Sequence, residues 1–132
     1  MKGAMADIML DLVHSEKYPF GVPYKKGGAD PTGIDCYGLI RWCARIARGI
    51  ELPEKPIGWR RHVEILPPET PIERCDVICF CTGASEVVTH IGMAISRTDF
   101  IHADHRFGAV VCEPILRYKD KIRAVARFKL DT

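Results

Sequence analysis

The chain has 132 residues, of which 47% are hydrophobic and 27% charged, and its formal net charge is +2 at pH 7. This length supports one hydrophobic core, so we expect a single domain over residues 1–132. The near balance of 19 basic and 17 acidic residues argues against a nucleic-acid partner, and the apolar content argues against disorder.

Two helices are expected in the first half of the chain. Residues 4–15 carry apolar side chains one helical turn apart, which predicts an amphipathic helix. A loop rich in glycine and proline follows over residues 19–33. Asp35 is a suitable N-cap for a second helix from Cys36 to about Arg48, which Gly49 would end.

The second half of the chain is expected to form strands. Residues 51–73 contain five prolines and are predicted to be mostly irregular, either as a wall of a substrate cleft or as a partner-binding loop. Five β-rich runs then follow, at 77–81, 87–96, 100–103, 109–113 and 122–128. Helices followed by strands indicate an α+β fold, in which the N-terminal helices pack on a mainly antiparallel sheet.

Membrane insertion and secretion are not expected. No stretch approaches the roughly 18 apolar residues that span a bilayer. The first residues lack the apolar core of a signal peptide, because Asp7 and Asp11 interrupt it. We therefore expect synthesis in the cytoplasm without a signal peptide and no membrane partner, and the six cysteines are expected to be thiols.

Cys36 is the first candidate for chemistry, because it follows the glycine-rich loop and begins the second predicted helix. A helix N-terminus carries partial positive charge, which favours a thiolate and lowers the pKa of the thiol. Its free backbone N–H groups can bind an oxyanion, and Gly38 is expected to leave room for a substrate. Taken alone, Cys36 could equally be a small buried residue at a helix start.

A base for this nucleophile must come from the five histidines. His90 stands in an apolar predicted strand and His102 in the next, with a tight turn over 96–99, so the two rings should be neighbours on one face. The second imidazole could then orient the first and fix its tautomer. Asp104 and His105 could compete for that role but are expected in a solvated turn, and a hydrogen-bonded core residue is the alternative for His90.

No metal site is expected among the cysteines. Cys75, Cys79 and Cys81 are clustered, but their spacing differs from the C-x-x-C type that closes a zinc site. Cys79 and Cys81 share one face of a predicted strand, where cysteine is a common small core residue, and Cys43 and Cys112 are also expected in the core.

Five blocks of the sequence, between Tyr18 and Val111, resemble the NlpC-type cell-wall cysteine peptidases. Residues 24–28 and 33–40 are similar to that family's Tyr-x-x-Gly-Gly and Gly-Phe-Asp-Cys-Ser-Gly-Leu-Val motifs. Residues 76–80 resemble its Asp-Leu-Val-Phe-Phe strand, residues 89–95 its His-Val-Gly-Ile-Tyr-Ile strand, and residues 100–103 its Phe-Ile-His-Ala strand.

The resemblance implies a papain-like α+β fold and a site without metal or cofactor. Cys36 would be the nucleophile, attacking as a thiolate paired with protonated His90, and His102 would orient that base. Tyr24, Asp35 and Tyr37 would contribute to substrate or oxyanion binding; the last replaces the family's serine, so its contacts and the peptide specificity are left open. The implied reaction is hydrolysis of an amide in peptidoglycan stem peptides, between γ-D-glutamate and a diamino acid.

The segment from Asp35 to Arg41, read with the missing signal peptide and wall-binding repeats, resembles the phage- and prophage-encoded branch of that family. This implies association with a virion tail, tail-tip proteins as partners and local opening of the cell wall. Three alternatives are a catalytically silent structural tail-assembly subunit, an injected amidase toxin and an acyltransferase acting on lipid.

Overall fold

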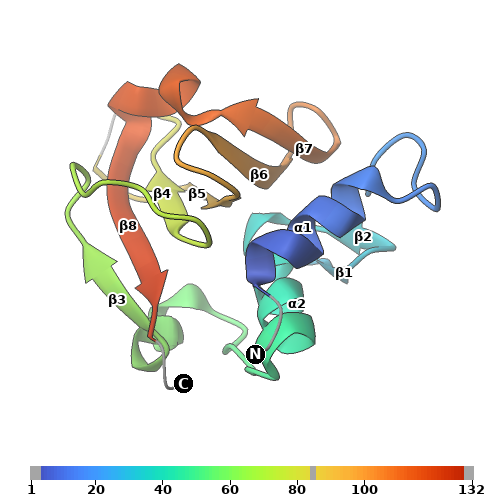
Figure 1. Cartoon of the computed structure of the whole chain (residues 1–132), viewed down its shortest axis with the longest axis horizontal. Coiled ribbons are helices and arrows are strands. Elements are labelled where there is room, and N and C mark those ends of the chain that lie inside the picture. The colour runs from blue at the N-terminus through green and yellow to red at the C-terminus, as the bar shows by residue number, and fades with distance from the viewer. Residues whose placement is uncertain (1–3, 84–85, 130–132) are drawn as a thin grey trace.

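The computed structural model describes residues 4–83 and 86–129, in which two helices lie against a six-stranded sheet (Figure 1). The strand order is β3-β8-β4-β5-β6-β7, and every neighbouring pair is antiparallel. The strands are β3 (Val63–Leu66), β4 (Val77–Phe80), β5 (His90–Ala94), β6 (Asp99–Asp104), β7 (Ala109–Pro114) and β8 (Ile122–Phe128). The predicted α+β class is therefore confirmed.

The two helices are α1 (Met5–His14) and α2 (Cys36–Arg48), and they pack against each other. Helix α2 also packs on β5 and β6, so its N-terminus lies beside the central strands. The predicted N-cap is confirmed, because a carboxylate oxygen of Asp35 accepts a hydrogen bond of 2.7 Å from the N–H of Gly38. Gly49 ends the helix in the left-handed conformation, with a φ of 66°.

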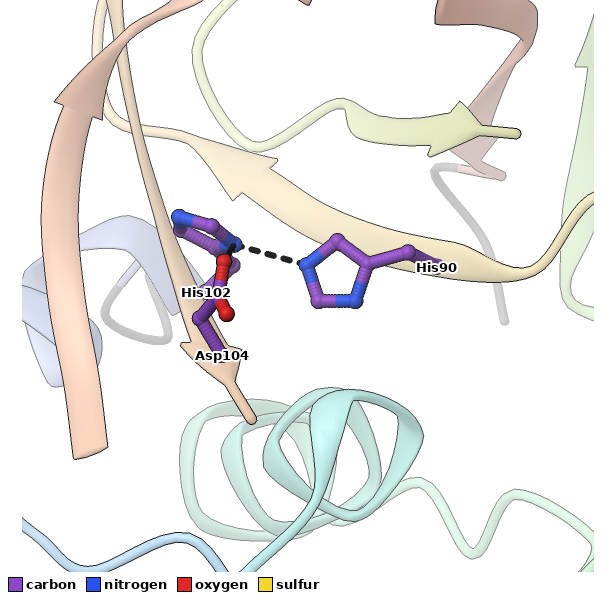
Figure 2. A group of neighbouring side chains, drawn as sticks. All are labelled: His90, His102 and Asp104. Carbon is purple, nitrogen blue, oxygen red and sulfur yellow. Dashed lines mark hydrogen bonds and ion pairs between the residues drawn. The ribbon is translucent and has the colours of Figure 1, made fainter. Parts of the chain in front are cut away.

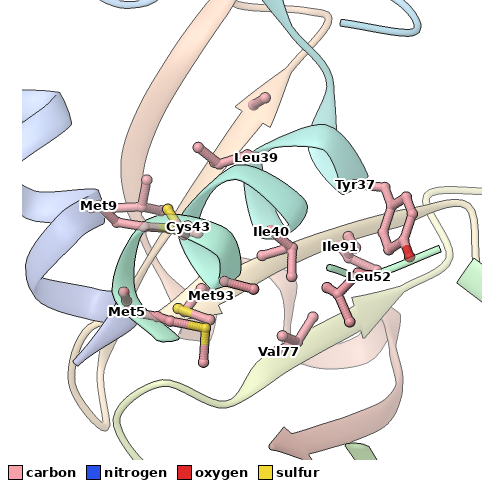
Figure 3. Close-up of a cluster of buried hydrophobic side chains, with 14 of the residues drawn as sticks. Met5, Met9, Tyr37, Leu39, Ile40, Cys43, Leu52, Val77, Ile91 and Met93 are labelled. Atoms are coloured by element: carbon pink, nitrogen blue, oxygen red, sulfur yellow. The ribbon is translucent and has the colours of Figure 1, made fainter. Parts of the chain in front are cut away.

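Apolar side chains are buried on both faces of the sheet. The larger cluster lies between the helices and the sheet (Figure 3) and includes Met9, Leu39, Ile40, Val77 and Met93. The second cluster is covered by the 3-10 helix η2 (Ile115–Lys121) and contains Ile78, Phe80, Ala94, Phe100, Ile115 and Tyr118. Successive residues of β4 alternate between the clusters, which explains why that strand is continuously apolar instead of alternating with polar residues.

The main differences from the sequence prediction lie in the loops and at the sheet edges. The short strands β1 (Ala29–Asp30) and β2 (Gly33–Ile34) pair within the glycine-rich loop, and the proline-rich segment contains β3 and the 3-10 helix η1 (Pro56–Arg61). Strand β3 is an edge strand with one fully buried side chain, so its apolar pattern is weak. Cys112 is exposed on the other edge strand instead of lying in the core. Within the described residues, no helix has the length and apolarity needed to cross a membrane.

Asp35 joins the glycine-rich loop to helix α2, because its two carboxylate oxygens accept from the N–H groups of Gly38 and Gly27 at 2.7 and 2.9 Å. We expect Asp35→Ala to lower the free energy of unfolding by about 1–2 kcal/mol, the usual cost of losing an N-cap. Urea unfolding followed by circular dichroism measures this loss. Asp35→Asn keeps one acceptor oxygen and should lose less; an Asp35→Ala protein as stable as wild type would contradict the role.

Candidate active site

The Cys36 thiol lies at the first residue of α2 and is partly buried. The backbone N–H groups of Ile91, Tyr37 and Cys36 itself favour the thiolate and act to lower the pKa of the thiol. The space beside Gly38 is filled by the protein and does not leave the room for a substrate that we expected, because a Cβ there would collide with the carbonyl oxygen of Gly28. The glycine-rich loop thus packs directly on the first turn of α2 and holds the thiol at the helix N-terminus.

His90 and His102 form a direct pair, as their positions on adjacent strands predict. His90 is the first residue of β5, and its Nε2 lies 2.6 Å from Nδ1 of His102 on β6 (Figure 2). The pair forms because Gly92 has no side chain: a Cβ there would lie 2.9 Å from the Cβ of His102 and 2.7 Å from Phe100. Phe100 in turn packs against the His102 ring, with centroids 4.4 Å apart.

A buried carboxylate that the sequence analysis did not identify extends this pair. Glu113 on β7 is 4% exposed, and its Oε2 lies 2.6 Å from Nε2 of His102. Tyr118 donates a second hydrogen bond to Oε2 at 2.6 Å, and Arg117 donates to Oε1 at 2.8 Å. The sequence did contain a signal for this residue: Glu113 ends an apolar predicted strand, and a carboxylate buried in such a strand needs hydrogen-bond partners.

Asp104 is buried at the end of β6, not in the solvated turn that we expected. Its carboxylate oxygens accept three hydrogen bonds from Arg106, at 2.7, 3.2 and 2.7 Å. The Oδ2 atom also lies 3.7 Å from Nδ1 of His102. Burial raises the pKa of Asp104, but the bonds from Arg106 outweigh it and lower the pKa to about 2. Asp104 is therefore an anion whose charge is matched by Arg106. His105 is exposed and contacts the ring of Tyr24 edge-on.

His90, His102 and Asp104 together offer three side chains of the kinds that bind metal ions, two imidazoles and one carboxylate. One atom each of His90, His102 and Asp104 lies within 4.8 Å of the others (Figure 2). The two ring nitrogens already bond each other at 2.6 Å, and the carboxylate is paired with Arg106. This donor set is engaged in internal hydrogen bonds and fits a proton relay better than a cation site.

Cys36 and His90 line one cavity of about 370 Å³. Its outer wall is formed by residues of η1 and β3, so the proline-rich segment 51–73 contributes to the cleft, one of the two roles left open by the sequence. The wall is mostly apolar, and among the described residues that line the cavity only Arg60 has a cationic side chain. The remaining lining residues are Tyr37, Pro56, Ile57, Trp59, Ile65, Cys79, Val88, Thr89, Ile91 and Ala124.

The three residues predicted to bind substrate or oxyanion occupy different places. Tyr37 lines the cavity, but its hydroxyl donates to the carbonyl oxygen of Pro53 at 2.6 Å, and its ring packs edge-on against Trp59. It therefore fastens the cleft wall to α2. Tyr24 lies near the thiol outside this cavity; burial, and then the negative charges of Cys36 and Asp35, raise its pKa. The Asp35 carboxylate is engaged by the two backbone N–H groups described above.

The electrostatics favour a neutral thiol and a neutral imidazole in the same cavity. Burial raises the pKa of Cys36, and this effect outweighs the opposite effect of the three backbone N–H groups. Burial, followed by the proximity of His102, lowers the pKa of His90 to about 4. These directions differ from the thiolate and protonated imidazole expected from the sequence, because a helix N-terminus lowers a thiol pKa by less than burial raises it here.

The comparisons with known proteins agree on one family. The model of the NlpC/P60 family matches residues 21–124. The murein DD-endopeptidase MepS/murein LD-carboxypeptidase of Escherichia coli K12 is 28% identical over 112 residues, which cover 81% of this chain and 58% of that protein. The gamma-DL-glutamyl hydrolase of Bacillus subtilis 168 is 31% identical over 127 residues, 95% of this chain and 30% of that protein. The chain thus spans about 58% or less of these relatives.

Solved structures give the same fold. NlpC2 of Trichomonas vaginalis superposes with a TM-score of 0.78 at 22% identity, over 97% of this chain and 49% of that one. An NlpC/P60 family protein of Bacillus cereus ATCC 10987 superposes with a TM-score of 0.72 at 23% identity, over 97% of this chain and 41% of that one. These likenesses confirm the expected papain-like arrangement of helices on an antiparallel sheet.

Alkylation of Cys36 tests the neutral pair. We expect its rate with iodoacetamide to rise about tenfold per pH unit between pH 6 and 8, in proportion to the thiolate fraction of a thiol with a raised pKa. Mass spectrometry of the Cys36 peptide measures this rate separately from that of the exposed Cys112. A rate that is constant over this range in wild type and falls in His90→Ala would indicate a resting thiolate–imidazolium pair instead.

Proposed function

Because the chain belongs to the NlpC/P60 family, we propose that it is a cysteine peptidase that hydrolyses an amide bond in peptidoglycan stem peptides. The observation that carries this proposal is the shared cavity of Cys36 and His90, with the base hydrogen-bonded to His102 behind it. A nucleophile, a base and a group that orients the base are the three parts that nucleophilic acyl transfer requires. The names of the two relatives, a murein endopeptidase and a gamma-DL-glutamyl hydrolase, support the substrate class.

The proposed reaction begins as Nδ1 of His90 takes the thiol proton while the sulfur of Cys36 attacks the scissile carbonyl carbon. The backbone N–H groups beside the sulfur can donate to the resulting oxyanion, a contribution of roughly 3 kcal/mol per donor in comparable sites. His90 then gives its proton to the leaving amine, and a thioester remains. A water molecule, deprotonated by His90, hydrolyses the thioester and releases the acid together with the free thiol.

The cut is proposed to fall between γ-D-glutamate and the diamino acid. Purified protein is incubated with defined stem peptides and with intact peptidoglycan, and the products are identified by mass spectrometry. We expect a new fragment that ends in γ-D-glutamate and is absent with Cys36→Ala, which removes the nucleophile. Other fragments that depend on Cys36 would place the cut elsewhere. No fragment from any substrate would reject the peptidase and favour a catalytically silent subunit.

Arg60 is proposed to bind a substrate carboxylate. A γ-linked glutamate keeps a free α-carboxylate next to the scissile amide, and Arg60 is the one cationic side chain among the described residues that line the mostly apolar cavity. We expect Arg60→Ala to raise KM about tenfold, equivalent to ~1.4 kcal/mol, with a small change in kcat. Steady-state kinetics on the cleaved peptide measure this change, and Arg61→Ala is the matched control because Arg61 is exposed and does not line the cavity. Equal effects of both substitutions would contradict the assignment.

A phage-tail location is proposed on narrower support, the resemblance of the Asp35–Arg41 segment to phage-encoded members of the family. The enzyme would then act with tail-tip proteins to open the cell wall locally. Its gene should lie beside genes for tail or tape-measure proteins. A neighbouring immunity gene would favour an injected amidase toxin, and a metabolic neighbourhood would reject both.

A further inference from the structure

We propose that Glu113 is a positioning residue that fixes the tautomers of both active-site imidazoles and so determines which nitrogen of His90 faces the nucleophile as a base. Glu113 does not line the cavity and so acts only through His102. The effect on rate rests on the proposed function, whereas the tautomers can be observed independently of it.

The first step is the protonation of Glu113. Burial raises the pKa of this carboxyl, but hydrogen bonds from Tyr118, Arg117 and His102 outweigh it and lower the pKa below its usual value. The carboxylate is therefore anionic and can only accept hydrogen bonds. Because its Oε2 lies 2.6 Å from Nε2 of His102, that nitrogen must carry a proton.

The second step is the position of the ring proton on His90. Burial lowers the pKa of His102 in spite of the Glu113 bond, so the ring is neutral and its Nδ1 is an acceptor. Nε2 of His90 lies 2.6 Å from this acceptor nitrogen, so His90 must hold its proton on Nε2. The Nδ1 lone pair of His90 then stays free to receive the thiol proton of Cys36.

The third step concerns the competing carboxylate. Asp104 lies 3.7 Å from Nδ1 of His102 and would favour a proton on that nitrogen, which would reverse the chain of donors. Its charge is instead neutralised by Arg106, which also donates to the hydroxyl of Tyr118 at 2.7 Å. The two carboxylates around His102 are thus unequal: Glu113 bonds the ring directly, and Asp104 is held by an arginine.

Replacing Glu113 by Gln should reverse both tautomers. Arg117 can only donate, so it will retain the amide oxygen at the Oε1 position and turn the NH₂ group toward Nε2 of His102. The Tyr118 hydroxyl, which donates to Oε2 in the wild type, can turn and accept from that NH₂ group. His102 must then carry its proton on Nδ1 and donate to Nε2 of His90, which moves the His90 proton to Nδ1, the atom needed as the base. We expect kcat on the stem peptide to fall at least about 100-fold, the lower range for losing a general base, with KM changed less than about threefold.

The tautomers are read from two-bond ¹H–¹⁵N spectra of protein with ¹⁵N-labelled histidine at pH 7. Wild type should show both rings protonated at Nε2, and Glu113→Gln should show both protonated at Nδ1. Glu69→Gln is the matched control, because it makes the same change of carboxylate to amide at an exposed loop residue that does not line the cavity; it should keep the wild-type tautomers and a kcat within about threefold.

Three outcomes would overturn the proposal: a wild-type His90 protonated at Nδ1, unchanged tautomers in Glu113→Gln, or equal losses of kcat in Glu113→Gln and Glu69→Gln. The wild-type spectrum alone keeps the test decisive if the Gln variant does not fold. A protein with the expected tautomers but no activity on any stem peptide would reject the proposed function while leaving the positioning role intact.

Discussion

Three neighbouring antiparallel strands carry a continuous line of hydrogen bonds from the cavity that Cys36 and His90 share into the protein interior. His90 on β5, His102 on β6 and Glu113 on β7 each contribute one side chain, and the two connecting distances are both 2.6 Å. The line depends on strand register, because a shift of one residue in either pair would turn one side chain to the opposite face of the sheet. The backbone pairing that builds the fold is therefore the same pairing that builds the relay.

Burial of this line explains the electrostatics of the site. His102 has no exposed surface and Glu113 very little, so an unpaired charge at either position would carry a large desolvation cost. The structure avoids that cost by giving Glu113 three donors and by pairing Asp104 with Arg106. The same burial lowers the pKa of His90 and raises that of Cys36, which leaves a neutral base in contact with the relay and a neutral thiol in the same cavity.

The nucleophile side of the cavity is set by a separate group of contacts. Asp35 caps α2 and anchors the glycine-rich loop, so the cysteine begins a helix whose first turn is held on two sides. Tyr37, the next residue, reaches in the other direction and donates to Pro53 at the start of the cleft wall. A serine at this position would be too short for that bond, so Tyr37 ties the wall of this cavity to α2.

The sequence by itself determined the class of the fold, the two helices, the strand-rich second half and the candidates Cys36, His90 and His102, because each depends on local periodicity, capping or a short motif. The N-cap at Asp35 and the left-handed Gly49 follow from such local rules and are present. Only the tertiary structure decided the rest. Glu113 lies eleven residues from His102 and meets it through sheet pairing, which no local pattern specifies. The edge strand β3, the burial of Asp104 and the direction of the Cys36 pKa shift likewise depend on what packs around them, and that environment is assembled from segments far apart in the chain.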